Sequence, residues 1–228
     1  MAVIVQEIDN GNASTTQASV AAGSLTFTAG NLIAAFVKHE VVASTITISG
    51  FTPGTKQANP GTNAWGQWFY KLAAAGGALN VTANFSPSTD FPSIFVYEVS
   101  ANGAWSLDTE ATANGTSTAI NSGNMTVAGP EGVAFGGYAE FTAAVFSAAQ
   151  INGVAADRTD TTALVSTIAW AKVHASGFTG AASGTIASSQ VWACCGIAFK
   201  AAATVAAAAR VPQSRPFPYK PGSPRGLR

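Results

Sequence analysis

The stretch from Thr62 to Glu98, TNAWGQWFYKLAAAGGALNVTANFSPSTDFPSIFVYE, decides the fold. It contains runs rich in aromatic and β-branched residues, separated by Gly-Gly and by Ser-Pro-Ser-Thr-Asp. Apolar and polar residues alternate in the middle run, as in a strand with one buried face. The last run is apolar on both faces, as in a strand covered on both sides. The stretch therefore predicts an antiparallel meander with strands near Ala64–Leu72, Ala78–Phe85 and Phe91–Val99 and a turn at Gly76-Gly77.

Short strand patterns separated by turn residues extend over the rest of the chain. Ala2–Ile8 predicts an opening strand, Phe51–Thr62 a loop rich in Pro and Gly, and Asn114–Thr118 a turn within the weakly patterned segment Ala101–Gly123. Further strands are expected at 24–28, 32–38, 44–49, 124–127, 132–138, 143–147, 162–175, 183–187 and 190–200. About twelve strands without an amphipathic helix predict an all-β fold, an antiparallel jelly-roll-like β-sandwich.

The composition changes after residue 200, which divides the chain into a sandwich domain, residues 1–200, and a tail, residues 201–228. The alanine-rich segment 201–210 favours a helix, but ten residues are marginal for a helix that stands alone. Residues 211–228, VPQSRPFPYKPGSPRGLR, hold five of the ten prolines. Proline excludes a helix or a central strand here, so we expect an extended arm.

Charge is scarce and unevenly distributed. Only 10% of the residues are charged, against roughly 25% in an average protein, which suits packing into an assembly or, alternatively, a β-rich protein with many Gly and Asn turns. Residues 1–200 carry a net charge of −5 and residues 201–228 a net charge of +5. A basic tail on an acidic body predicts that the arm docks on a neighbouring subunit. The predicted partner-binding residues are Arg210, Arg215, Pro216, Phe217, Pro218, Tyr219, Lys220, Arg225 and Arg228.

The sequence also bears on location. It contains no run of 18 apolar residues, so no transmembrane helix is expected. The first residues, MAVIVQEIDNG, lack the basic and apolar regions of a signal peptide, which predicts synthesis in a host cytoplasm without secretion by that route. The adjacent Cys194 and Cys195 are interpreted as small buried residues, because a disulfide between neighbours is strained.

Several pieces together resemble a loosely characterised β-sandwich module of phage virion proteins and bacterial surface proteins. They are GNLIAAFVKHE, STITISGF, WGQWFYKLAAAGGALNVTANFS, IFVYEVS, LDTEATANGTSTAINSGNMTV and VWACCGIAFK, spread over residues 20–200. The resemblance implies a concanavalin- or jelly-roll-like sandwich and no enzyme, since the module has no agreed activity. The chain carries one module with a tail, which favours a virion protein. Val99 stands where the module often has Tyr-Ser, so no family role is carried over to Glu98.

No catalytic signature is found. Glu98, at the end of an apolar strand, is interpreted as a buried carboxylate bonded to a backbone amide or to Lys71, with a raised-pKa acid as the alternative. Asp108 and Glu110 lie two residues apart, and a solvated turn is favoured over a sugar-hydrolysing pair. No paired carboxylates, nucleophile with a base or phosphate-binding loop is recognised, so neither a catalytic residue nor a cofactor is predicted.

Metal sites are also weakly supported. Asp157, Arg158 and Asp160 form a charged loop, but it lacks a known calcium repeat. The two histidines, His39 and His174, have no zinc-ligand spacing. No metal site is therefore predicted.

Two tryptophans raise a binding alternative. Trp65 and Trp68 are candidate glycan-binding residues, because aromatic rings stack on sugars, although at least one of them is expected in the core. A flat exposed face formed with Phe69 or Trp105 would favour this alternative. Nucleic acid is a weaker candidate partner, because five cations over the 28-residue tail are few and the prolines suit protein docking better.

The sequence favours a structural virion protein, a phage capsid decoration or head-accessory protein whose C-terminal arm docks on other virion subunits. A closed homo-oligomer, with a trimer as the preferred order, would cover the edge strands. The alternative is a lectin-like, carbohydrate-binding module of a tail fibre or cell surface. A glycan-processing enzyme is a third hypothesis, which two carboxylates facing each other across a cleft would support.

Overall fold

The computed structural model describes residues 1–9, 13–41, 43–61, 63–129, 131–142, 145–161 and 167–202. These residues form fifteen β-strands and no helix, and every strand pair is antiparallel. The predicted all-β antiparallel sandwich is therefore confirmed. No helix in the described ranges is long and apolar enough to cross a membrane. The predicted arm lies beyond residue 202, outside the described residues, and stays a prediction.

The N-terminal half, β1 to β8, is a sandwich of two sheets. The five-stranded sheet has the order β1 (Val3–Asp9), β8 (Ser93–Ser100), β3 (Leu32–His39), β6 (Trp65–Lys71) and β5 (Thr52–Ala58). The three-stranded sheet has the order β2 (Gln17–Phe27), β7 (Gly77–Thr89) and β4 (Thr45–Ile48). The three strands expected between Ala64 and Val99 are present as β6, β7 and β8, but the predicted meander is wrong, because β7 belongs to the smaller sheet and pairs with neither β6 nor β8. The expected turn at Gly76-Gly77 is confirmed, since both glycines have positive φ, of 79° and 89°, and the turn carries the chain from one sheet to the other.

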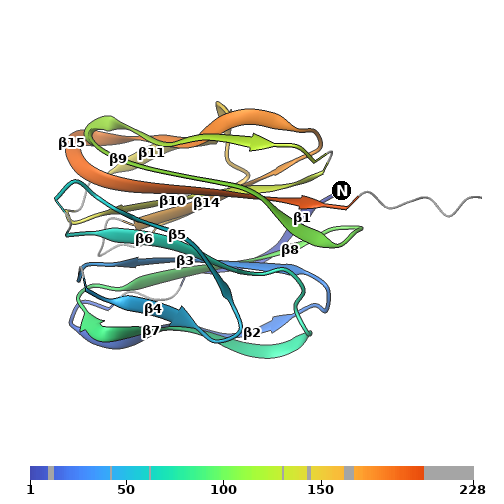
Figure 1. Ribbon diagram of the computed structural model, residues 1–228, viewed down its shortest axis with the longest axis horizontal. Helices are drawn as coiled ribbons and strands as arrows, with labels where there is room; N and C mark the ends of the chain where they lie inside the picture. Colours follow the sequence, from blue (N-terminus) through green and yellow to red (C-terminus); the bar gives the residue numbers. More distant parts are fainter. Residues whose placement is uncertain are drawn as a thin grey trace, which may run out of the picture.

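The C-terminal half is a single seven-stranded sheet that folds over on itself. It consists of β9 (Trp105–Val127), β10 (Gly132–Glu140), β11 (Phe146–Ile151), β12 (Val154–Ala155), β13 (Arg158–Thr161), β14 (Thr167–His174) and β15 (Phe178–Ala201). The long pair β9 and β15 loses its register between Thr185 and Gln190. Such an irregularity lets a strand bend, and the two ends of each strand lie in different layers (Figure 1).

The two halves share one topology. The larger sheet of the N-terminal half has the order β1-β8-β3-β6-β5. The C-terminal half repeats this order with the first part of β9, the last part of β15, β10, β14 and β13. The outer sheet β2-β7-β4 matches the last part of β9, the first part of β15 and β11. Even the bulges recur: Gly23 and Gly123 occupy equivalent irregularities with φ of 81° and 83°. The two halves thus repeat one strand arrangement within the chain, and we call this repeat the internal duplication. The sequence patterns did not reveal it.

The halves pack together through their larger sheets, so the described residues form four stacked layers (Figure 1). Trp68 lies at the centre of the shared core, with its ring centroid 5.1 Å from those of both Phe36 and Phe135. Its indole donates a hydrogen bond of 3.1 Å to the carbonyl of Cys195. A Cβ at Gly137 would lie 2.3 Å from the ring of Phe36, so this glycine makes room for the ring.

Three expectations about local structure are wrong. The predicted turn at 114–118 lies inside β9, the predicted loop 51–62 contains β5, and the strands expected at 183–187 and 190–200 form one continuous β15. Gly115 marks close packing, since a Cβ there would lie 2.7 Å from the ring of Trp192. A glycine that admits a neighbouring ring has the same sequence signature as a turn glycine. Part of the strand expected at 162–175 lies outside the described residues, and the remainder forms β14.

Candidate functional site

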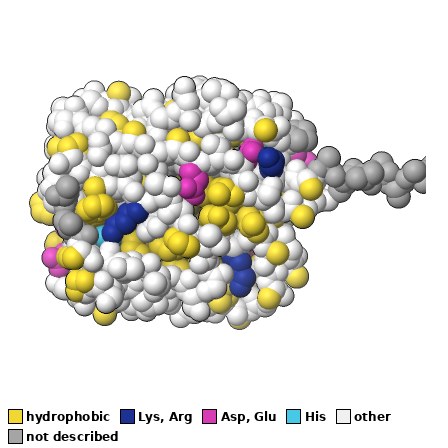
Figure 2. Space-filling model, viewed as in Figure 1, with side chains coloured by type: hydrophobic (Ala, Val, Ile, Leu, Met, Phe, Trp, Pro, Cys, Tyr) yellow, Lys and Arg dark blue, Asp and Glu magenta, His cyan; other side chains and the backbone are white. Residues whose placement is uncertain are grey.

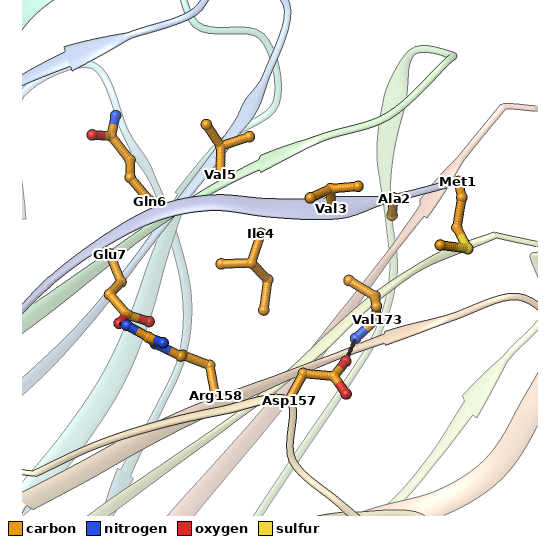
Figure 3. Close-up of a pocket in the computed structure, with 10 residues that line it drawn as sticks. All are labelled: Met1, Ala2, Val3, Ile4, Val5, Gln6, Glu7, Asp157, Arg158 and Val173. Atoms are coloured by element: carbon orange, nitrogen blue, oxygen red, sulfur yellow. Dashed lines mark hydrogen bonds and ion pairs between the residues drawn. The ribbon is translucent and has the colours of Figure 1, made fainter.

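A groove of about 590 Å³ runs along β1 at the side of the molecule (Figure 3). Residues 1–7 form one wall, and Asp157, Arg158 and Val173 form the other. Among the described strands, β1 pairs only with β8, so it is an edge strand of its sheet. One edge of β1 therefore offers backbone N–H and C=O groups for pairing with another strand.

The side chains of β1 make this edge apolar. Val3 and Val5 are 50% and 48% exposed, and Figure 3 shows them pointing to the side opposite Ile4. Ile4 points into the groove, toward the wall that carries Val173, and both side chains pack against the shared core. Because both faces carry apolar side chains, an added segment would find apolar contacts on either face of the sheet.

The equivalent edge in the C-terminal half is polar. The register of β1 with β8 shifts between Ile4 and Gln6, and β9 shifts at the equivalent place, which aligns Val3 with Ser106 and Val5 with Asp108. Asp108 accepts hydrogen bonds from Lys200 Nζ at 2.8 Å and from the Ala128 amide at 2.7 Å. The fold is therefore compatible with polar residues at these positions, and the exposed valines of β1 need another explanation.

The charged residues of the groove are mostly paired with one another. Arg158 forms an ion pair with Glu7, and Asp157 accepts from Lys172 Nζ at 2.7 Å and from the Val173 amide at 2.8 Å. The oxygen Oε2 of Glu7 is buried and has no hydrogen-bond partner among the described residues. Since an unpaired buried acceptor is costly, this oxygen is a polar group that the described residues leave unsatisfied.

Both ends of the described chain meet at one end of this groove. The N-terminal ammonium of Met1 lies 3.1 Å from Glu131 Oε1, and the Ala201 amide donates to the Glu131 carbonyl at 2.9 Å. Figure 1 shows the N-terminus beside the end of β15. Residue 202, which precedes almost all of the predicted tail of residues 201–228, therefore lies near the Met1 end of the groove.

The predicted charged loop is not arranged as a calcium site. Asp157 faces Lys172, whereas Asp160 accepts a hydrogen bond of 2.6 Å from the Tyr97 hydroxyl. Burial raises the pKa of Asp160, and the Tyr97 hydrogen bond and Arg158 offset part of that rise. The carboxylates thus serve different partners, and the described part of the chain contains no group of three or more His, Cys, Asp or Glu side chains suited to a metal.

The candidate acids likewise have structural partners. Glu98 is 1% exposed and accepts hydrogen bonds from the Thr28 amide at 2.6 Å, from Asn31 Nδ2 at 2.7 Å and from Gln6. The interpretation of Glu98 as a buried carboxylate bonded to a backbone amide is confirmed, without Lys71 as a hydrogen-bond partner.

Asp108 and Glu110 do not lie in the solvated turn that was expected, because both belong to β9. They also face different partners, Lys200 for Asp108 and Thr55 for Glu110. Their contacts place them in structural roles.

The aromatic residues proposed for glycan binding do not form an exposed row. Trp68, Phe69 and Trp105 are 2%, 1% and 6% exposed, so their rings belong to the core. Trp65 is half-buried, with His39 stacked at 6.2 Å and the Lys56 ammonium 4.5 Å above its ring. Trp68 cannot offer a face to a sugar, and the rings that were to form the platform are covered.

A buried ionic cluster was not predicted. Lys38 is fully buried and forms an ion pair with Glu40. Burial lowers the pKa of Lys38 and raises that of Glu40, while each partner opposes the other's shift and Glu140 acts on Lys38 as well. Lys38 and Glu140 both have no exposed surface, so these groups are sealed from any substrate in solution. The cysteines behave as expected: Cys194 and Cys195 are buried free thiols.

The rest of the surface has few charges. On the side shown in Figure 2, isolated charged side chains lie among hydrophobic and uncharged polar ones. Sequence reasoning placed an opening strand at Ala2–Ile8 but did not recognise it as an open edge. The available signal was the run Val3-Ile4-Val5, apolar on both faces although it begins the chain.

No protein-family model, curated protein or solved structure matches the chain. Function is therefore inferred from the geometry of the chain itself.

Proposed function

We propose that the protein is a structural virion subunit, a capsid decoration or head-accessory protein of a bacteriophage, that docks on neighbouring subunits. The observation that carries this proposal is the open edge of β1 with its exposed Val3 and Val5. Proteins normally protect edge strands with charges, prolines or covering segments. An edge that combines free backbone groups with apolar side chains is explained by a partner that covers it.

The remaining features agree with a role in assembly. The carboxylates beside the groove and the buried Lys38 bond to other groups of the protein, which leaves them structural roles. The low charge lets large areas of surface approach another subunit at little desolvation cost. The setting in a phage particle rests on the resemblance of residues 20–200 to a virion module. Synthesis in the host cytoplasm and a homo-oligomer, with a trimer as the preferred order, belong to the same proposal.

The experiment is quantitative mass spectrometry of purified particles from a phage that encodes this chain. We expect the chain in a fixed ratio to the major capsid protein that survives repeated density-gradient purification. Particles without the chain, or with traces that disappear on purification, would refute the virion role.

The matched surface variants are Val3→Ser with Val5→Asp, which place on β1 the residues of the equivalent strand, and Val154→Ser elsewhere on the surface. Val154 is 51% exposed, so its substitution removes about as much exposed apolar surface as the loss of either Val3 or Val5 alone. We expect the first variant to lose incorporation into particles and the second to retain it. Equal incorporation of both would remove β1 from the docking surface.

A further inference from the structure

We propose that the groove along β1 receives residues 215–219 of a neighbouring copy's arm as an added antiparallel β-strand. The inference rests on the proposed function, since it names the partner and the contact through which subunits join. An edge strand that accepts an extended peptide is an established mode of recognition, in which backbone hydrogen bonds supply affinity and side-chain pockets supply specificity.

The order of prolines in the arm suits a strand that pairs along one edge. The segment reads Arg215-Pro216-Phe217-Pro218-Tyr219. In an extended chain, alternate residues direct their backbone groups to the same edge. Phe217 and Tyr219 keep their N–H groups on one edge, and the two prolines, which have none, occupy the other. The added strand would pair with β1 and end the sheet, because its outer edge cannot accept a further strand.

The same alternation matches the side chains to the two faces of β1. Phe217 and Tyr219 would share one face of the added strand and fill the groove beside Ile4, where two rings would bury about 150–250 Å² each. Pro216 and Pro218 would lie on the opposite face, over the exposed valines of β1. The groove, at about 590 Å³, lies in the size range of pockets that hold compact ligands.

The charges orient the added strand. With Arg215 at the Glu7 end of the groove, its positive charge would lie beside the Glu7 carboxylate, whose side chain is 13% exposed. Phe217 and Tyr219 would then follow toward Ile4 and Met1, so the arm would run antiparallel to β1. The reverse direction would place Arg215 beside the N-terminal ammonium of Met1, which disfavours it by like-charge repulsion.

The direction also favours a neighbouring copy over the chain's own arm. Residue 202 lies near the Met1 end of the groove, so the chain's own arm would have to extend along β1 and turn back before it could run antiparallel to that strand. An arm from another copy can enter at the Glu7 end. Residues 203–214 supply twelve residues of connection, which extend to at most about 40 Å and can reach an adjacent subunit.

The test uses two full-length variants that fail in complementary ways. Phe217→Ser with Tyr219→Ser removes the rings of the arm but leaves the groove, whereas Val3→Asp with Val5→Asp charges the edge but leaves the arm. Light scattering after size exclusion should show that the wild type associates, that each variant alone is at least tenfold weaker, and that a mixture forms a one-to-one complex. A mixture that stays as monomers would overturn the proposal.

A disulfide trap separates the two sources of the arm. Val5→Cys with Pro218→Cys in one chain should form dimers linked between chains on oxidation, and Val154→Cys with Pro218→Cys is the control pair that should not. Links within a single chain would show the chain's own arm in the groove and overturn the neighbouring-copy assignment. If the arm variant still enters particles at the wild-type ratio, the arm contact is wrong while the virion role stands.

Discussion

Acid should destabilise the protein through His39, and His39→Leu should remove that sensitivity. The His39 side chain on β3 is fully buried, with Trp65 stacked at 6.2 Å and Phe85 at 6.0 Å. Burial, together with the positive charges of Lys56 and Lys38, lowers the pKa of His39 to about 3, and the backbone of Val41 offsets part of this shift.

The sign and size of this acid sensitivity follow from the difference between the pKa of His39 in the folded and in the unfolded state. The unfolded chain takes up the His39 proton near pH 6.5, whereas the folded protein takes it up only near its pKa of about 3. The unfolded state therefore binds more protons between these values, and stability falls as the pH falls through this window. The loss is about 2 kcal/mol at pH 5 and about 4 kcal/mol at pH 3, at 1.36 kcal/mol per unit of pKa.

Other groups titrate in the same range, so the comparison with a variant is essential. Glu40 acts with the opposite sign: burial raises its pKa, so the folded state takes up a proton first and gains stability as the pH falls. This contribution is common to the wild type and to His39→Leu and cancels in their difference. Leucine suits the site because it is apolar and the aromatic neighbours of His39 do not require a polar partner.

The assay is urea unfolding at intervals between pH 7.5 and 4, with the free energy of unfolding compared at each pH. The variant should gain about 2 kcal/mol relative to the wild type between pH 7.5 and pH 5. Because the chain has two histidines, NMR of the wild type and variant assigns each imidazole signal and measures its pKa directly. Parallel stability curves, or a His39 signal that titrates near pH 6.5, would refute the reasoning.

Three further substitutions test the core by chemical denaturation. Gly137→Val should destabilise the fold by about 1–3 kcal/mol, because its Cβ would lie 2.3 Å from the Phe36 ring; Phe36→Leu in the same chain should recover part of this loss, and no recovery would contradict the interlocking of the halves. Glu98→Gln should cost about 1–3 kcal/mol, because the remaining oxygen can still accept from Thr28 and Asn31, whereas the amide nitrogen that replaces Oε2 cannot accept from Gln6 Nε2; an unchanged midpoint would argue against the bond from Gln6. Trp68→Phe should cost at least about 1 kcal/mol by removing the indole donor that bonds to the Cys195 carbonyl, and a neutral effect would argue against that contact.

Sequence reasoning identified the fold class because local patterns determine it. The alternation across β7, the apolar β8 and the glycine turn before β7 all appear in the structure. It failed where one residue type serves two purposes. Gly115 resembles a turn signal, yet it makes room for the ring of Trp192, which lies far away in the sequence. The long strands β9 and β15 were divided because their polar, glycine-containing segments resemble turns when their pairing is unknown.

The internal duplication was hidden for a related reason. Where two equivalent sheets face each other, a large side chain on one sheet needs space on the other. Equivalent positions in the two halves therefore carry side chains of different size. Phe36 is equivalent to Gly137, and the ring of the first lies where a side chain of the second would be. A search for similar residues at a fixed spacing loses its signal at such positions. The clearest repeated features are in the backbone, such as the positive φ of Gly23 and Gly123.

The duplication also provides an internal control for the candidate site. Both β1 and the first part of β9 lie at edges of the described sheets, so an open edge by itself does not distinguish a docking surface. The two edges differ in their side chains: Val3 and Val5 are exposed on β1, whereas β9 carries Ser106 and an Asp108 that bonds within its own half. Since the same backbone supports both sets, folding does not require the valines. An apolar set on only one of two equivalent edges is what the proposed docking contact requires, and β1 is where that contact is expected.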